Sequence, residues 1–290
     1  MNRVLLFLAI FFFANASAQR TDFLKITKYR VSFLSDSLKE NSGLNFFRGN
    51  LYTMNDGGNS SDIFEIDKSS GKILNTIKTG LVNTDWEAVA SDSLFIYIAD
   101  FGNNAGMRKD LKIYKIPASD SVRSDTVKTI SYHYPEQSDF TRKVISNDFD
   151  AEAMIVLHGK IHVFTKEWAS RSTTHYILNP DLTENQAAEK TESFKTGFFV
   201  TDAAYYTGKL YLVGYTKNTE VFLSVFNETE PGVFFSKPPR KYYLGSSLKI
   251  GQIEGIEVDD NGVYISGEEF KTPLGLAKQA LYFIPARKLR

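Results

Sequence analysis

The stretch that decides the fold is residues 85–100, which read DWEAVASDSLFIYIAD. It contains the triplet Glu87-Ala88-Val89, in which an oxygen-bearing residue is followed by a small residue and then by an apolar one. A β-type residue, Tyr97, stands 10 positions after the first residue of the triplet. The apolar runs on either side of Ser91 and Asp92 indicate two strands joined by a tight turn.

The same triplet pattern occurs five times along the chain. Its copies are Ser42-Gly43-Leu44, Glu87-Ala88-Val89, Glu152-Ala153-Met154, Asp202-Ala203-Ala204 and Glu254-Gly255-Ile256. The first positions are separated by 45, 65, 50 and 52 residues. A β-type residue follows each of them after 10, 10, 11, 9 and 10 positions, at Tyr52, Tyr97, Val163, Tyr211 and Tyr264. A recurring interval with a nearly constant internal register indicates a repeated structural unit.

Each unit continues with further strand-like segments. A third strand is expected at 63–66, 113–116, 175–178, 222–225 and 281–284, and a fourth at 73–78, 129–134, 192–198 and 240–244. Four strands in about 50 residues is the pattern of a β-propeller blade. The fold class predicted is therefore all-β, a β-propeller of five four-stranded blades, with six blades as the alternative.

The fifth unit has no fourth strand of its own, because the chain ends soon after Ile284. A strand-like segment at 26–34 has no place in the other units. If this N-terminal segment supplied the missing outer strand, the ring would be closed and no blade would be left with an open edge.

The first 18 residues resemble a secretory signal peptide. They combine Arg3 near the start, the apolar run 4–13 and the small-residue sequence Ala16-Ser17-Ala18. We expect residues 19–290 to form a single propeller domain that is exported to the periplasm or secreted. The apolar run is too short to span a bilayer, and no later run is longer, so no membrane span is expected.

Composition excludes several classes of function. The chain has no cysteine, which rules out disulfides, thiol nucleophiles and zinc sites built on cysteine. Its 34 basic and 34 acidic residues give a formal net charge of zero and are scattered, so no nucleic-acid partner is expected. We expect a monomer.

The repeated triplet predicts a central metal site. In a propeller the innermost strands surround the channel, so the five first positions should approach one another near the axis. These positions are Ser42, Glu87, Glu152, Asp202 and Glu254. Carboxylates placed together resist joint ionisation unless a cation joins them, and oxygen ligands of this kind suit Ca²⁺. The alternative is a water-filled, partly protonated acidic channel.

A second set of residues follows the second strand of each unit, where the chain returns to the same face. It comprises Asn55 and Asp56, Asp100, Lys166, Tyr215 and Lys217, and Glu268 and Glu269. In the loop after Asp100, the side chains of Asn103, Asn104 and Arg108 could hold a small anionic ligand together with Lys166 and Lys217. Exposed loop charge and ordinary turn chemistry are the other interpretation of the same residues.

The ordered series Ser42, Glu87, Glu152, Asp202, Glu254 resembles the calcium-activated nucleotidase (apyrase) family. The resemblance implies a five-bladed propeller, a central Ca²⁺ held by residues of successive blades, and hydrolysis of nucleoside di- and triphosphates. In that family the fourth position is Ser. The chain also looks like other calcium-centred propellers, such as lactonases and phytase-like esterases, and more closely like exported propellers of Bacteroidetes-type bacteria, which share motifs such as 55–58 and 85–87.

Two functions fit these observations. In the first, the protein is a calcium-dependent hydrolase of phosphate esters or anhydrides, with Asp56 or Asp100 as the base and Arg108 with Lys166 holding the anion. In the second, the calcium is structural and the propeller face binds a glycan, a peptide or an envelope protein without catalysis. An open coordination position would favour the first.

Overall fold

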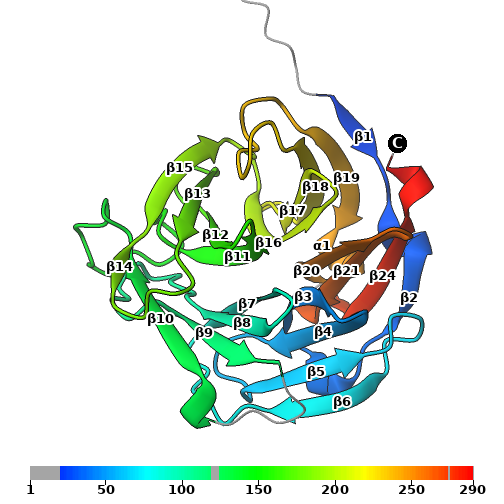
Figure 1. Cartoon of the computed structure of the whole chain (residues 1–290). Helices are drawn as coiled ribbons and strands as arrows, with labels where there is room; N and C mark the ends of the chain where they lie inside the picture. Colours follow the sequence, from blue (N-terminus) through cyan, green and yellow to red (C-terminus); the bar gives the residue numbers. More distant parts are fainter. Residues whose placement is uncertain (1–19, 119–123, 274, 290) are drawn as a thin grey trace, which may run out of the picture.

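The computed structural model describes residues 20–118, 124–273 and 275–289. Five small antiparallel sheets are arranged around a common axis, as Figure 1 shows. The predicted five-bladed β-propeller is therefore confirmed, and the six-blade alternative is wrong. The expected signal segment, residues 1–18, lies outside the described residues.

Each blade has four strands, counted here from the channel outward. Blade 1 consists of β3 (Asn41–Phe47), β4 (Asn50–Asn55), β5 (Asp62–Ile66) and β6 (Ile73–Lys78). Blade 2 consists of β7 (Trp86–Ser91), β8 (Phe95–Asp100), β9 (Lys112–Pro117) and β10 (Lys128–His133). Blade 3 consists of β11 (Ala151–Leu157), β12 (Lys160–Thr165), β13 (Thr173–Leu178) and β15 (Glu189–Phe194). Blade 4 consists of β16 (Phe199–Tyr206), β17 (Lys209–Tyr215), β18 (Glu220–Asn227) and β19 (Arg240–Ser246). Blade 5 consists of β20 (Gln252–Asp259), β21 (Gly262–Glu268), β24 (Ala280–Pro285) and β2 (Arg30–Phe33).

The remaining elements are short. Two of them add a fifth strand to a blade: β14 (Gln186–Ala187) to blade 2 and β1 (Thr21–Phe23) to blade 4. A small hairpin is formed by β22 (Phe270–Thr272) and β23 (Gly275–Ala277). The helical turns are η1 (Ile26–Tyr29), η2 (Asp36–Leu38), η3 (Ser124–Thr126), α1 (Ser247–Ile250) and η4 (Ala286–Lys288). Within the part of the chain that the structure describes, no helix has the length and apolar character needed to cross a membrane.

The N-terminal segment closes the ring, as the repeat pattern predicts. Strand β2 pairs antiparallel with β24 and becomes the outer strand of blade 5. The structure adds a second attachment, because β1 pairs in parallel with β19 of blade 4. The segment therefore joins two neighbouring blades and supplies the outermost strand of each.

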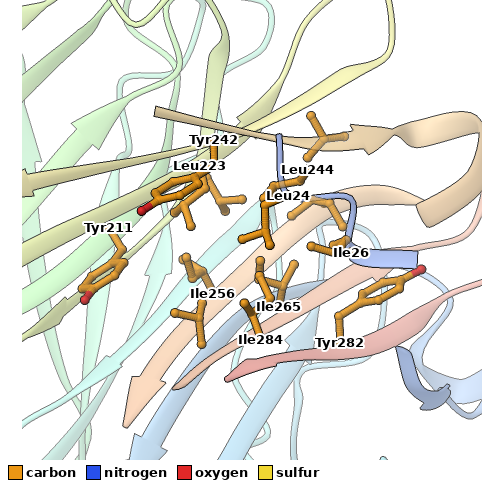
Figure 2. Close-up of a cluster of buried hydrophobic side chains, with 14 of the residues drawn as sticks. Leu24, Ile26, Tyr211, Leu223, Tyr242, Leu244, Ile256, Ile265, Tyr282 and Ile284 are labelled. Carbon is orange, nitrogen blue, oxygen red and sulfur yellow. The ribbon is translucent and has the colours of Figure 1, made fainter. Parts of the chain in front are cut away.

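Apolar side chains fill the spaces between blades. In the cluster between blades 4 and 5, Leu223 lies opposite Ile256 and Ile265, and all three are buried (Figure 2). Leu24 and Ile26, which lie between β1 and β2, pack into the same cluster. Burial of this apolar surface holds the ring together without any disulfide.

The five inner strands, β3, β7, β11, β16 and β20, surround the channel (Figure 1). Each contains a β-bulge near its start. The unpaired residues at these bulges are Gly43, Glu87, Glu152, Thr201 and Glu254. We call the end of the channel where the inner strands begin the upper mouth, and the end where they stop the lower mouth.

Candidate functional site

A polar cavity of about 300 Å³ lies at the upper mouth. It is lined by Ser42, Asp56, Glu87, Asn104, Ile145, Glu152, Lys166, Trp168, Tyr215, Gln252 and Glu254. Carboxylates from four blades meet here, and Lys166 is the only cation among the described residues that line the cavity. The cavity therefore carries an excess of negative charge.

Three of these carboxylates reach the cavity from equivalent positions. Glu87, Glu152 and Glu254 are the bulged residues of β7, β11 and β20, and all three are buried. A bulge places two residues opposite one on the partner strand and re-aims a side chain that regular pleating would direct elsewhere. The repeated triplet thus becomes a ring of inward-facing acids because the bulge repeats with it.

The densest acidic group lies between blades 1 and 2. One carboxylate oxygen from each of Asp56, Asp85 and Glu87 can be chosen so that all three lie within 4.8 Å of one another. Two glycines make room for this group: a side chain at Gly57 would come within 2.4 Å of Asp85 Oδ1, and one at Gly102 within 2.3 Å of Glu87 Oε1. The backbone is therefore shaped around the three carboxylates.

Hydrogen bonds fix the segments that carry this group. The Asp100 carboxylate, which is fully buried, accepts the backbone N–H groups of Thr84 (3.4 Å) and Asp85 (3.2 Å). The Asn83 side chain donates to the carbonyl oxygen of Asp56 at 2.9 Å and accepts from the N–H of Trp86 at 3.1 Å. These contacts hold the loop before β7 against the end of β4.

On the other side of the cavity, Lys166 forms a buried ion pair with Glu152. Its Nζ contacts Glu152 Oε1 and also donates to the Tyr215 hydroxyl at 3.1 Å. The second carboxylate oxygen, Glu152 Oε2, is buried without a hydrogen-bond partner among the described atoms. Glu254 Oε1 accepts from the Gln252 side chain at 2.8 Å.

Burial and mutual repulsion weaken the acids of the upper mouth. Burial, reinforced by neighbouring carboxylates, raises the pKa of Asp85 to about 7, and burial raises that of Asp56 to about 6. Burial also raises the pKa of Glu87 well above its usual range, with the charges of Asp56, Glu152 and Asp85 adding to the effect. A bound cation would relieve this repulsion.

The pKa values of Lys166 and Glu254 both reflect burial and the charges around them. Burial lowers the pKa of Lys166, but Glu152, Tyr215, Glu254 and Asp150 together outweigh it and hold that pKa well above the usual value. Burial raises the pKa of Glu254 to about 8, although Lys166 acts against this shift. The ammonium therefore neutralises one side of the cavity, while Asp56, Asp85 and Glu87 form no ion pair with a Lys or Arg within the part of the chain that the structure describes and feel Lys166 and Arg108 only at longer range.

Asp202 lies apart from the cavity. Its carboxylate is fully buried and accepts the backbone N–H groups of Ala203 (2.8 Å), Ile256 (2.7 Å) and Leu44 (3.3 Å). Thr201, one residue earlier, occupies the bulge position that corresponds to Glu87, and its hydroxyl donates to the Ile253 carbonyl at 2.6 Å. The sequence alignment of the triplets was therefore wrong by one residue in blade 4, because it followed residue type and not the bulge.

Blade 1 also departs from the triplet alignment. Its bulged residue is Gly43, with a φ of 70°, so Ser42 stands one position before the bulge. Ser42 still lines the cavity, and its hydroxyl donates to the Glu87 carbonyl at 2.7 Å. This bond ties the inner strand of blade 1 to that of blade 2.

In the loop after β8, the side chains of Asn103 and Arg108 bind other groups of the protein. Arg108 pairs with Asp100 (2.9 Å) and Asp110 (3.1 Å) and donates to the Gly102 carbonyl at 3.0 Å. The Asn103 side chain donates to the Phe149 carbonyl and accepts from the Arg108 N–H. Asp100, Asn103 and Arg108 were candidates for the base and the ligand contacts, but none of them lines the cavity.

The remaining predicted ligand residues are divided between hollows. Asn104 and Lys166 line the upper cavity. Lys217 lines a separate hollow of about 180 Å³ with Arg171 and Phe199. Asn55 lines another hollow and donates to the Ser37 carbonyl at 2.8 Å. The second set of sequence positions therefore does not form one ring.

Three residues of the site were missed by the sequence analysis: Asp85, Trp168 and Gln252. Asp85 stands in a bend just before β7, so the alternation of a strand does not place it and the sequence carries no usable signal for it. Trp168 has no counterpart in the repeated triplets that would mark it as a site residue. Its indole N–H donates to Asp150 at 2.8 Å, which fixes the ring where it lines the cavity.

Comparisons with known proteins add little. A scan against models of protein families found no match, and a search of curated protein sequences found none. Among solved structures the chain is similar to hydrazine synthase from Kuenenia stuttgartiensis, with a TM-score of 0.40 and 10% identity over 83% of this chain. The chain spans 59% of the length of that structure. A similarity of this size carries no argument, so the function is argued from the site itself.

Proposed function

We propose that this propeller binds a divalent cation, with Ca²⁺ as the expected ion, at the upper mouth through Asp56, Asp85 and Glu87. The observation that supports the proposal is the close approach of these three carboxylates in a space kept clear by Gly57 and Gly102. Three acids with raised pKa values and no ion-pair partner among the described side chains form an unfavourable group unless an ion joins them.

The donor set fits a hard cation. All three groups offer oxygen, and the described residues lining the cavity include neither His nor Cys. Ca²⁺ accepts about six to eight oxygen ligands in irregular geometry, whereas zinc favours nitrogen and sulfur. Ser42 and Glu254 line the same cavity and are available as further oxygen donors.

We further propose that the site hydrolyses phosphate esters or anhydrides. Three carboxylates cannot complete the coordination of Ca²⁺, and two of them, Asp56 and Glu87, line a cavity of about 300 Å³, which leaves room for water and substrate. When bound, the ion would polarise a phosphoryl oxygen. Lys166 lies on the opposite wall and offers a positive charge to the same anion.

Glu152 is the residue we propose as the proton acceptor. Lys166 holds Glu152 Oε1, while Oε2 is left without a partner. A carboxylate fixed at one oxygen and unpartnered at the other can accept a proton from a water molecule in the cavity. Asp56, an earlier candidate for the base, becomes a cation ligand in this proposal.

A second candidate function is binding of a glycan without catalysis. The observation that favours it is Trp168, whose partly exposed ring lines the cavity beside Tyr215 and could stack on a sugar. In either case we propose that the protein acts outside the cytoplasm, on the strength of residues 1–18.

The first test is calorimetric titration of chelator-treated protein with Ca²⁺. We expect binding, together with a rise in melting temperature, and a Kd weakened about tenfold or more by Glu87→Gln and by Asp85→Asn. The control is Asp139→Asn, an exposed acid paired with Lys143. If both variants bind Ca²⁺ as the parent does, the proposed site is wrong.

Catalysis is tested separately, by phosphate release from ATP, ADP and p-nitrophenyl phosphate with and without Ca²⁺. We expect calcium-dependent turnover that Glu152→Gln reduces by about a hundredfold, within the range of general acid–base contributions. Calcium binding without turnover of any of these substrates would leave the glycan-binding propeller as the better account.

A further inference from the structure

The lower mouth holds a second cavity, of about 420 Å³. It is lined by the final residues of all five inner strands, and none of its lining residues also lines the upper cavity. The Asp202 carboxylate, held by the amides of Leu44 and Ile256, lies on the inner strands between the two ends. The lower cavity is therefore a separate site.

Apolar residues form part of its wall, which exposes as much polar as apolar surface. The apolar lining residues are Leu44, Phe46, Val89, Ala90, Met154, Ile155, Val156, Ala203, Ala204 and Val258. The tyrosines Tyr205 and Tyr206 also line it, and their hydroxyl groups are engaged by Glu228 and Asp260. A cavity of this kind favours an apolar body, since binding removes apolar surface from water on both sides.

One carboxylate is built into this wall. Glu257 accepts the Phe46 N–H at Oε2 and the Val258 N–H at Oε1, both at 2.8 Å. Each oxygen has a further lone pair, so the carboxylate can still accept a hydrogen bond from a ligand. Burial raises the pKa of Glu257 to about 7, as expected for an acid with no cation beside it.

The other charges at the lower mouth are already paired. Lys68 lies 3.1 Å from Asp259, and its Nζ is also over the rings of Phe46 and Tyr264. The positive charge of Lys68 is therefore neutralised by Asp259, and we do not expect it to bind an anionic ligand. Glu257 is left as the unbalanced charge, and a positively charged ligand group would complement it.

We propose that the lower mouth binds a small organic amine, a ligand with a protonated amino group and an apolar aromatic or alkyl body. The amino group would donate to Glu257, and the body would lie against Phe46 and Val156, which line the cavity and are partly exposed. The inference is independent of the cation proposed for the upper mouth, because the two cavities share no lining residue.

The test compares three probes of similar shape by calorimetry: 2-phenylethylamine, 2-phenylethanol and 3-phenylpropanoate. We expect the amine to bind about tenfold more tightly than the alcohol, and the carboxylate to bind most weakly. Glu257→Gln should remove the preference for the amine over the alcohol. Equal binding of amine and alcohol to the parent protein, or the best binding by the carboxylate, would overturn the proposal.

Two further variants keep the test decisive. Val156→Trp adds bulk at a partly exposed edge of the cavity and should abolish binding of both the amine and the alcohol, even if Glu257→Gln folds poorly. Glu254→Gln changes the upper mouth only and should leave amine binding unchanged. Amine binding that survives Val156→Trp but is lost in Glu254→Gln would place the amine in the upper cavity and sink the proposal.

Discussion

The two mouths of the channel are built by the same five strands and yet differ in chemistry. At the upper mouth Glu87, Glu152 and Glu254 face a strongly polar cavity, whereas the lower mouth combines apolar and polar residues around Glu257. The difference arises at the bulges, because each bulge re-aims one residue near the start of a strand while the rest continues in regular pleating. A propeller can therefore hold a strongly polar site and a partly apolar site on one axis.

Lys166 provides the largest test of the difference between the two mouths. Its ammonium is the only positive charge among the described residues that line the upper cavity. We expect Lys166→Met to destabilise the calcium-free protein by about 3 kcal/mol, because the buried Glu152 loses its partner. Calcium should restore most of this loss and should bind more tightly than to the parent. Urea unfolding with and without Ca²⁺ measures both effects.

The matched control for this variant is Lys68→Met at the lower mouth. Lys68 pairs with Asp259 at a more exposed position, so its loss should change stability by less than about 1 kcal/mol. Equal losses in the two variants, with no rescue by calcium, would contradict the view that Lys166 neutralises buried acids at the upper mouth that calcium can neutralise in its place.

Asp202 links the inner strands of three blades between the two mouths. We expect Asp202→Asn to destabilise the protein by about 2 kcal/mol, because an amide group cannot accept all three backbone N–H groups that the carboxylate accepts. Calcium affinity should remain within about twofold of the parent, since Asp202 does not line the upper cavity. A large loss of calcium affinity in a well-folded variant would return Asp202 to the metal site.

The sequence was sufficient for the blades and the closure of the ring. The triplet and the residue about ten positions later marked the inner two strands of every blade, because alternation and turn residues are local properties. The spare segment at 26–34 identified the closing strand. Its second attachment, β1 along β19, had no sequence signal, since three residues do not show a pairing partner.

The site was less predictable, because it depends on register and on contacts between distant segments. The predicted site residues Glu87, Glu152 and Glu254 occupy the bulge positions of their strands. In blade 4 the bulge position is Thr201, one residue before the predicted Asp202. Arg108 forms ion pairs with Asp100 and Asp110. The sequence alone does not show whether such an arginine binds these acids or a ligand. The lower cavity gave no signal, since its apolar lining residues look like any other core residues.

A further effect we expect is a pH dependence that separates the two mouths. In the calcium-free protein the pKa values of Asp85 (about 7), Glu254 (about 8) and Glu257 (about 7) are raised above those of the unfolded chain. The folded state therefore retains protons that the unfolded state has already released between about pH 4 and pH 8. Because the folded state binds more protons in this range, the free energy of unfolding should fall as the pH rises.

Calcium should remove most of this dependence, because the ion stabilises the ionised acids of the upper mouth but does not reach Glu257. The slope that persists with saturating Ca²⁺ should then disappear in Glu257→Gln. Melting temperatures measured at pH 5, 6, 7 and 8, with and without Ca²⁺, test both steps. An unchanged slope after calcium is added would mean that the titrating acids of the upper mouth do not face the ion.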